Sequence, residues 1–240
     1  MPRSNRYILP GYVYHLTHRC HNRSFLFNFA KDRKEYRDRL RIALTEFNVS
    51  LMTYCITSNH AHLLVRADAP ETISKLMQKL EGEFAEFYNI RKKRSGAFWG
   101  GRFHCTMIDS GEYLWNCMKY IDLNMVRAGI VPHPADWDWC GYRELMGIRK
   151  RYCLINMDMV LAQYQEASID DFRSNYAFAI QDAINRQELQ RDPAWTESIA
   201  VGTKSFVDEI QQATNNRTDF TINEVSTNKW TIKETTTPYG

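Results

Sequence analysis

Two histidines separated by one residue are the first candidates for chemistry in this sequence. His60 and His62 lie in the segment SNHAHLLV, whose apolar end is typical of a β-strand. Side chains two positions apart on a strand point to the same face, so both imidazoles can converge on one metal ion. The alternative is a pair of partly exposed strand histidines that bind nothing.

A tyrosine and an asparagine form the second candidate group. Tyr120 and Asn124 stand four residues apart in EYLWNCMKYIDLNMVRAG. On a helix they share one polar stripe with Asn116 and Arg127. The opposite stripe is apolar and should face a sheet, which leaves Tyr120 at the helix edge. The apolar residues are Leu114, Met118, Ile121, Met125 and Ala128. The alternative is a tyrosine that only borders an amphipathic helix.

Cations interleaved with aromatic residues suit a single-stranded nucleic acid, because rings stack on bases and guanidinium groups meet phosphates. The candidate nucleic-acid-binding residues are Arg19, Asn22, Arg23, Trp99, Arg102, Phe103 and Arg127, and a basic run covers residues 91–94. The alternative for Trp99 and Phe103 is that they belong to the core. The alternative for the basic run is a solvated helix end.

Strands and helices in a regular order position these residues. Residue patterns predict strands at 12–18 and 103–109, a hairpin at 49–68 that turns at 57–59, and helices at 31–47, 71–94 and 112–128. This order is the split βαβ pattern of an α+β, ferredoxin-like sandwich with a largely antiparallel sheet. Short helices are expected for 156–212, and a hairpin or loose tail for the polar, Thr-rich end.

Charge divides the chain into a basic body and an acidic extension. Residues 1–154 hold 24 Lys and Arg against 15 Asp and Glu, a net of +9, and residues 155–240 hold 7 against 13, a net of −6. We therefore predict one domain at 1–154 and a helical extension with an acidic tail at 155–240. A basic body fits a polyanion such as nucleic acid. The extension either screens this basic surface or packs on the body and stabilises it.

Other function classes find little support. The six cysteines show no paired spacing, which suits reduced, buried thiols better than disulfides or a zinc site. No apolar run is long enough to span a membrane and no signal peptide is evident, so a cytoplasmic protein is expected. The sequence contains no GxxxxGK[ST] phosphate loop, so a P-loop ATPase is not indicated.

Together these segments resemble the single-tyrosine HUH transposases, and within them the REP-associated tyrosine transposases. The resemblance covers most of residues 9–145. It is carried by LPGYVYHLTHRCHNRSFLF, YCITSNHAHLLV, GAFWGGRFHC and YLWNCMKYIDLNMVRAGIV, and more weakly by AWTESIAVGTKSFVDEI. Three departures stand out: Met125 replaces the usual proline, Cys20 a common glycine, and Thr57-Ser58 the usual Met-Pro.

The resemblance implies that His60 and His62 bind Mg²⁺ or Mn²⁺, with Asn124 as a further ligand. It implies that Tyr120 is the nucleophile, which would form a 5′-phosphotyrosine link. The implied partners are single-stranded DNA and the DNA hairpins of palindromic repeats, and for the protein itself we favour a monomer over a homodimer. One alternative is a regulator that binds repeat hairpins without cleaving them. A histidine phosphoesterase is less consistent, because Leu64 stands where an HxHxH motif needs histidine.

Overall fold

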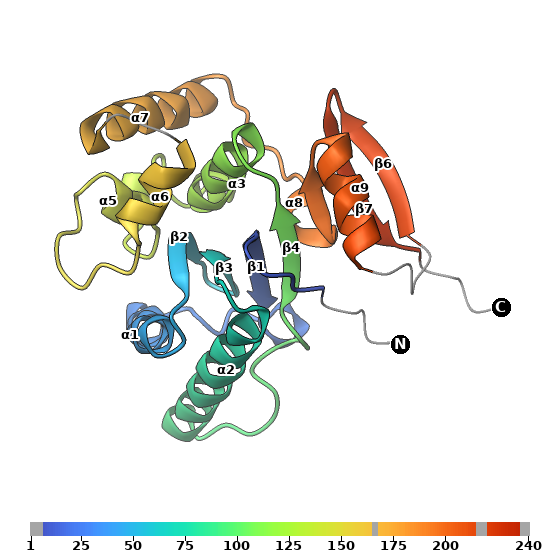
Figure 1. Cartoon of the computed structure of the whole chain (residues 1–240). Helices are drawn as coiled ribbons and strands as arrows, with labels where there is room; N and C mark the ends of the chain where they lie inside the picture. Colours follow the sequence, from blue (N-terminus) through green and yellow to red (C-terminus); the bar gives the residue numbers. More distant parts are fainter. Residues whose placement is uncertain (1–6, 165–167, 215–219, 236–240) are drawn as a thin grey trace.

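A mixed sheet runs through the computed structural model, which describes residues 7–164, 168–214 and 220–235 (Figure 1). Within these residues the sheet has seven strands in the order β2-β3-β1-β4-β5-β7-β6. The strands are β1 (Val13–Arg19), β2 (Ser50–Ile56), β3 (His60–Arg66), β4 (His104–Ile108), β5 (Ala200–Gly202), β6 (Phe220–Ser226) and β7 (Lys229–Glu234). Neighbouring strands are antiparallel except β4 and β5, which are parallel.

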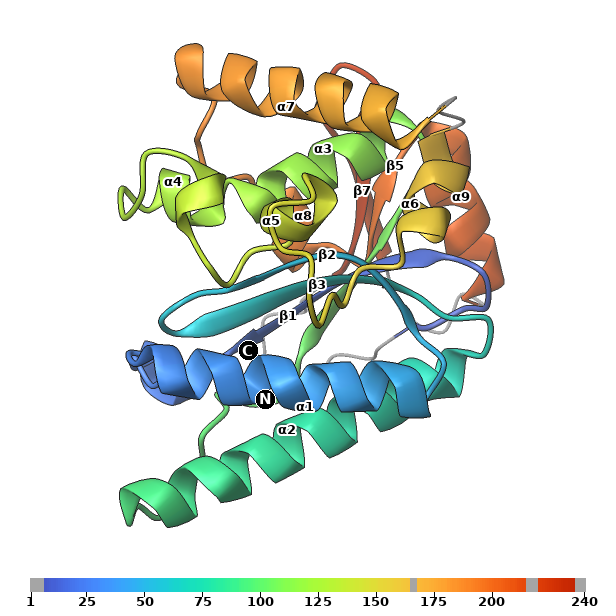
Figure 2. The ribbon, with the colours of Figure 1, turned by 90° about the vertical axis from the view of Figure 1, so that its left-hand side faces the viewer.

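Helices cover both faces of the first four strands. Figure 2 shows α1 (Ala30–Glu46) and α2 (Pro70–Lys92) on one face. On the other face lie α3 (Glu112–Asp122), α4 (Asn124–Arg127), α5 (Tyr142–Leu145) and α7 (Ile169–Asn185). The order β1-α1-β2-β3-α2-β4 confirms the predicted α+β, ferredoxin-like fold. No helix in the described ranges is both long and apolar enough to cross a membrane.

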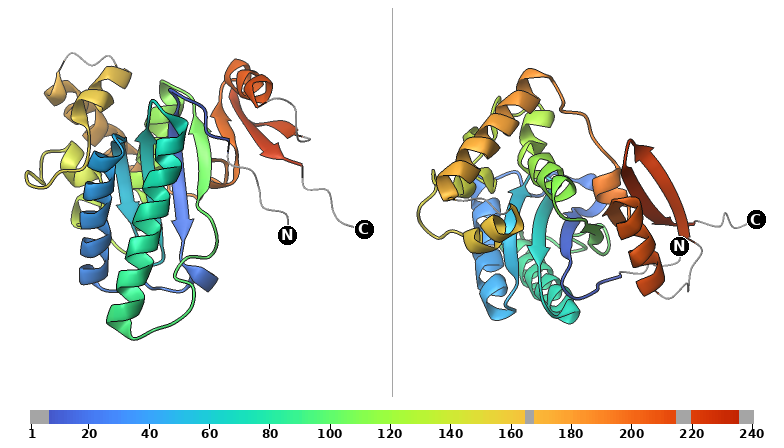
Figure 3. Two further views of the ribbon diagram at one scale, coloured as in Figure 1. Left: turned by 60° about the horizontal axis from the view of Figure 1, so that its bottom comes forward. Right: turned by 45° about the horizontal axis from the view of Figure 1, so that its top comes forward.

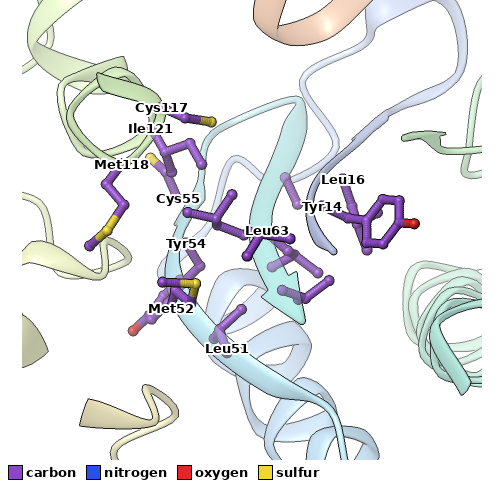
Figure 4. Packing of buried hydrophobic residues seen from close by; sticks show 14 of the residues in the cluster. Tyr14, Leu16, Leu51, Met52, Tyr54, Cys55, Leu63, Cys117, Met118 and Ile121 are labelled. Atoms are coloured by element: carbon purple, nitrogen blue, oxygen red, sulfur yellow. The ribbon is translucent and has the colours of Figure 1, made fainter. Parts of the chain in front are cut away.

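The core forms where the sequence patterns place apolar side chains. In α1, Tyr36, Leu40 and Ala43 recur every three or four residues and are buried against the sheet. On the opposite face, Figure 4 shows α3 side chains such as Ile121 beside Cys55 of β2. The apolar face of α3 is therefore held against the sheet, and this fixes the rotation of the helix that carries Tyr120.

The Trp-rich segment after α4 closes the outer edge of β2. It contains a short 3₁₀ turn (Pro134–Asp136), and Trp137 donates from its indole nitrogen to the carbonyl of Ile56 at 3.1 Å. The amide of Ile56 donates in turn to the carbonyl of Trp139 at 2.9 Å. Both backbone groups of Ile56, at the end of this edge strand, are thereby satisfied within the chain.

The C-terminal extension contains the expected helices and also extends the sheet. Besides α7 it holds α6 (Met157–Tyr164), α8 (Ala194–Glu197) and α9 (Lys204–Ala213). Strand β5 pairs with β4, and the predicted polar hairpin is β6–β7, on the far side of β5 (Figure 3). Residues 165–167, 215–219 and 236–240 of the predicted extension and tail lie outside the described residues. The boundary near residue 154 remains a prediction.

Candidate active site

The two candidate metal ligands open strand β3. His60 pairs with Arg19 and His62 with Thr17 in the register with β1, and the two imidazole centroids are 4.7 Å apart. The spacing of two residues places both rings on one face, as the strand period requires. His62 is almost fully buried, whereas His60 is partly exposed.

The turn before β3 orients the ring of His60. Its Nδ1 lies 2.9 Å from the Thr57 hydroxyl oxygen and 2.6 Å from the side-chain oxygen of Asn59. The Thr57 hydroxyl itself donates to the main-chain oxygen of His60, and the amide oxygen can only accept. Nδ1 of His60 therefore carries the proton, and Nε2 is the ring nitrogen with a lone pair for an ion.

Asn124 completes a set of three donors. Its side-chain nitrogen lies 3.1 Å from Nε2 of His62, and the residue is 9% exposed. A rotation of the Asn124 amide group by about 180° would place its oxygen, instead of its nitrogen, beside Nε2 of His62. Two imidazole nitrogens and one amide oxygen can hold a divalent ion, although neutral ligands bind Mg²⁺ weakly. Phosphate oxygens and water would have to complete the coordination shell.

Burial keeps the candidate ligands neutral. It lowers the pKa of His60 to about 3 and that of His62 well below its ordinary value. Nearby cations lower both pKa values further, among them Arg19 and Arg127. A neutral imidazole is the form that binds a metal, so the environment suits this role. In the described ranges no cluster of three or more His, Cys, Asp or Glu residues offers another metal site.

A third histidine contacts this group and was not anticipated from the sequence. His15 on β1 is fully buried; its Nε2 lies 2.8 Å from Nδ1 of His62, and its Nδ1 lies 2.7 Å from the Trp195 carbonyl oxygen. Burial lowers the pKa of His15 to about 3. The only signal in the sequence is a histidine inside the apolar strand YVYHLTH, where a buried polar ring needs partners.

Tyr120 lies beside the histidines. Its ring centroid is 6.2 Å from that of His62 and 6.1 Å from that of His15, and 8% of the residue is exposed. Burial raises the pKa of the Tyr120 phenol, and the positive charge of Arg127 opposes this shift. Tyr113, two helical turns before Tyr120, donates its hydroxyl to the main-chain oxygen of Asn228 instead.

The helix that carries Tyr120 is interrupted, in contrast to the continuous helix predicted over 112–128. Helix α3 ends at Asp122 and α4 begins at Asn124, because Leu123 has a ψ of 2° rather than a helical value. The amide of Leu123 still bonds to the carbonyl of Lys119 at 2.9 Å. The break is therefore small, and Asn124 still faces His62.

Two clefts flank the site. One, of about 390 Å³, brings most of the candidate DNA-binding cations to the metal pair. Its lining includes Arg19, Asn22, Arg23, His60, His62, Arg102 and Arg191. The other, of about 490 Å³, is lined by Tyr120, Arg127 and residues of the segment between α7 and α8. Arg127 therefore lines the same cleft as Tyr120, whereas the other candidate cations line the cleft of the histidine pair.

Two of the predicted DNA-binding residues pack in or against the core of the protein. Phe103 is 4% exposed. Trp99 stacks on His18 at 4.2 Å and donates its indole N–H to the Glu81 carbonyl at 3.0 Å. The ring of Phe103 is buried and that of Trp99 is partly buried against the core, so both have packing partners within the protein, and their contact with DNA remains a prediction. Arg91, in the basic run at 91–94, also has a partner within the protein, because it forms an ion pair with the buried Asp32.

The chain matches a transposase family model and is similar in fold to a solved transposase. Residues 9–124 match the family model described as "Transposase IS200 like". A REP-associated tyrosine transposase, in a structure bound to a REP hairpin, is similar at 17% identity and a TM-score of 0.54, covering 61% of this chain and 86% of that one. A candidate transposase from Deinococcus radiodurans reaches 16% identity and a TM-score of 0.36, covering 54% of this chain and 98% of its own. No curated protein matches the chain significantly.

Proposed function

Because residues 9–124 belong to the IS200-like transposase family, we propose that the chain is a metal-dependent, single-stranded DNA endonuclease and strand transferase. The observation that carries this proposal is the position of Tyr120, whose ring lies beside His62 and His15 and in the cleft next to the cationic one. A nucleophile, three neutral metal ligands and a phosphate-binding surface are the parts that strand transfer needs.

In the proposed reaction the Tyr120 oxygen attacks a DNA phosphorus. The new bond joins the tyrosine oxygen to phosphorus, the bond from phosphorus to the 3′ oxygen breaks, and the proton lost by the phenol is balanced by the one gained at the 3′-hydroxyl. The product is a 5′-phosphotyrosine link that preserves the phosphoester for rejoining to another strand. A bound Mg²⁺ or Mn²⁺ would supply positive charge to a non-bridging phosphate oxygen.

The residues of the protein position both partners in this reaction. His60, His62 and Asn124 would hold the ion without adding negative charge near the phosphate. Arg127 stands over the Tyr120 ring, where its charge favours the phenolate. Arg19, Arg23 and the other cations of the first cleft would bind the phosphates that flank the reacting one.

We propose DNA hairpins of palindromic repeats as the target and the cytoplasm as the location. The related REP-associated transposase is described bound to a REP hairpin, which supports this choice of partner. A hairpin offers a duplex stem for the basic surface and an adjoining single strand for the cleft. A hairpin-binding regulator without cleavage is less consistent with a chain that retains the tyrosine and all three ligands.

The test is a covalent adduct. A labelled hairpin with a single-stranded flank is incubated with the full chain and Mn²⁺ and then run on a denaturing gel. The wild type should give a protein–DNA adduct, and Tyr120→Phe should give none while binding the hairpin equally well. Tyr113→Phe is the matched control, because its hydroxyl bonds to the β6–β7 turn, and it should still form the adduct. An adduct that persists in Tyr120→Phe would move the nucleophile elsewhere.

A further inference from the structure

A buried histidine joins the candidate metal ligands to the C-terminal extension. His15 bridges the Nδ1 of His62, at 2.8 Å, and the main-chain carbonyl of Trp195, at 2.7 Å. The rings of His15 and His62 are stacked, with centroids 5.0 Å apart and planes at 22°. Trp195 belongs to α8, 180 positions along the chain from His15.

The carbonyl fixes the direction of both hydrogen bonds. A carbonyl oxygen only accepts, so Nδ1 of His15 must carry a proton. Both partners of His15 are uncharged, and a buried cation without a charged partner is strongly disfavoured, so the ring is neutral and its Nε2 is an acceptor. His62 must then donate from Nδ1. The proton of His62 is therefore on Nδ1, and its Nε2 keeps the lone pair.

That Nε2 faces the third candidate ligand. It lies 3.1 Å from the side-chain nitrogen of Asn124, which can donate to the lone pair while no ion is present. We propose that His15 and the Trp195 carbonyl hold His62 in the tautomer whose Nε2 binds the divalent ion, so that the C-terminal extension completes the metal site. His15 is thus a positioning residue, and this inference rests on the proposed function.

The carbonyl of Trp195 is firmly held. The Trp195 side chain is buried under the Lys229 ammonium, which lies 4.1 Å from the ring centroid and pairs with Asp192. Three residues further on, the Ser198 carbonyl accepts from the Thr106 hydroxyl at 2.7 Å. Thr106 is the β4 partner of His15 in the sheet register. Strands β1 and β4 therefore bind two carbonyl groups of this segment, one within α8 and one at the residue that follows it.

The two histidine ligands are thus oriented by different means. Thr57 and Asn59 in the adjoining turn hold His60, so its tautomer is set within four residues of sequence. The orientation of His62 depends instead on a hydrogen bond to His15, which is itself bonded to the Trp195 carbonyl in the extension. Partners of this kind, which do not touch the ion, commonly change metal affinity by about 10- to 100-fold.

The first measurement is made on the metal-free wild type. Long-range ¹H–¹⁵N spectra of the histidine-labelled full chain report which ring nitrogen of His62 carries the proton. The inference requires Nδ1. A proton on Nε2 of His62 would overturn it, and no variant is needed for this result.

The second measurement is Mn²⁺ affinity by calorimetry. His15→Phe should weaken Mn²⁺ binding by about 10- to 100-fold. His15→Gln keeps a donor and an acceptor and should recover most of the affinity, which a purely structural role would not require. Thr106→Val is the matched control: it removes one buried bond to the same segment and leaves the bond between His15 and Trp195 in place, so it should cost much less Mn²⁺ affinity than His15→Phe.

The Mn²⁺ affinities of the wild type and two variants separate an error in the role of His15 from an error in the proposed function. His60→Ala should abolish Mn²⁺ binding. If the wild type binds no Mn²⁺, or His60→Ala binds it equally well, the metal site itself is wrong and the inference falls with it. If those two results are as expected but a folded His15→Phe binds Mn²⁺ like the wild type, only the role of His15 is overturned. Should His15→Phe not fold, the spectrum of the wild type and the affinity of His15→Gln decide.

Discussion

Arg127 lies across the ring of Tyr120. Its guanidinium carbon is 4.1 Å from the ring centroid, and its Nη2 donates to the Tyr120 carbonyl at 2.9 Å. The phenol is buried, which raises its pKa, and the cation beside it lowers the pKa again. The arrangement therefore limits the cost of forming a phenolate inside a mostly buried site.

Arg127→Leu should slow cleavage because it removes this charge. The pKa of Tyr120 would rise further, so less phenolate would be present at any given pH, and the rate should be restored only at higher pH. A loss of about tenfold at pH 7.5 corresponds to a pKa change of about one unit, if the phenolate is the attacking form. Single-turnover cleavage between pH 7 and 10 measures this shift.

Arg127→Lys is the control for charge. It retains the cation without the planar contact, so its rate profile should lie between those of the wild type and Arg127→Leu. If Arg127→Leu loses rate equally at every pH, the arginine acts by holding DNA or the helix end, and its effect on the phenol is excluded.

Sequence patterns indicated most residues of the candidate site because their arrangement follows local periodicities. The strand period places His60 beside His62, and the helical repeat places Asn124 near Tyr120 even across the break at Leu123. His15 escaped notice because its role depends on the register of β1 against β3 and on a carbonyl far along the chain. Neither the strand register nor the distant carbonyl group can be predicted from a local residue pattern.

The strands of the extension were also hard to predict from local sequence patterns. Strand β5 has only three residues, and its pairing with β4 is decided by tertiary contacts. Trp99 and Phe103 were ambiguous for a related reason. An aromatic residue among cations has the same sequence signature whether it stacks on a base or on a buried histidine, and only its contacts in the folded protein separate the two.

Asp122 should make the stability of the protein depend on pH. This carboxylate is fully buried and accepts hydrogen bonds from Thr53, Cys140 and Tyr176 of helix α7. Burial raises its pKa from 3.8 to about 6. The folded state therefore binds the proton more tightly than the unfolded state, so this contribution is full below pH 4 and is lost as pH rises through 6.

The measurement is the difference in unfolding free energy between the wild type and Asp122→Asn at several pH values. Other groups titrate in both proteins and cancel. The difference should move against the wild type by about 2 kcal/mol between pH 4 and 7 and stay flat above that. A difference that does not change across this window would contradict the raised pKa of Asp122.

Cutting the chain after Leu154 should destabilise the body. Truncation leaves β4 without its partner β5 and removes Phe172, Tyr176 and Trp195, which are buried in the intact chain. Each such side chain contributes about 1.5–3 kcal/mol when buried. A melting curve should show a marked loss of stability or an insoluble product. A truncated protein that melts like the full chain would show that the extension is a separate unit.

Truncation therefore cannot test whether acidic residues of the extension compete with DNA, but a single substitution can. Glu197 lines the cationic cleft together with Arg191, and the two exposed side chains form an ion pair there. Glu197→Gln removes one negative charge and frees Arg191 for a phosphate. Binding of single-stranded DNA should become several-fold tighter at low salt. The slope of log affinity against log salt should steepen by about 0.7, because one more phosphate contact releases its counterion.

Affinity at several salt concentrations checks this prediction, with Asp208→Asn as the matched control. Asp208 also forms an exposed ion pair, with Lys204 on α9, and it is not among the residues that line the cleft. Its substitution changes the net charge equally but should leave the slope unchanged. If both variants tighten binding to the same extent, the effect is that of net charge. If Glu197→Gln binds no better than the wild type, the carboxylate does not compete with DNA, and the extension contributes to the site through its packing alone.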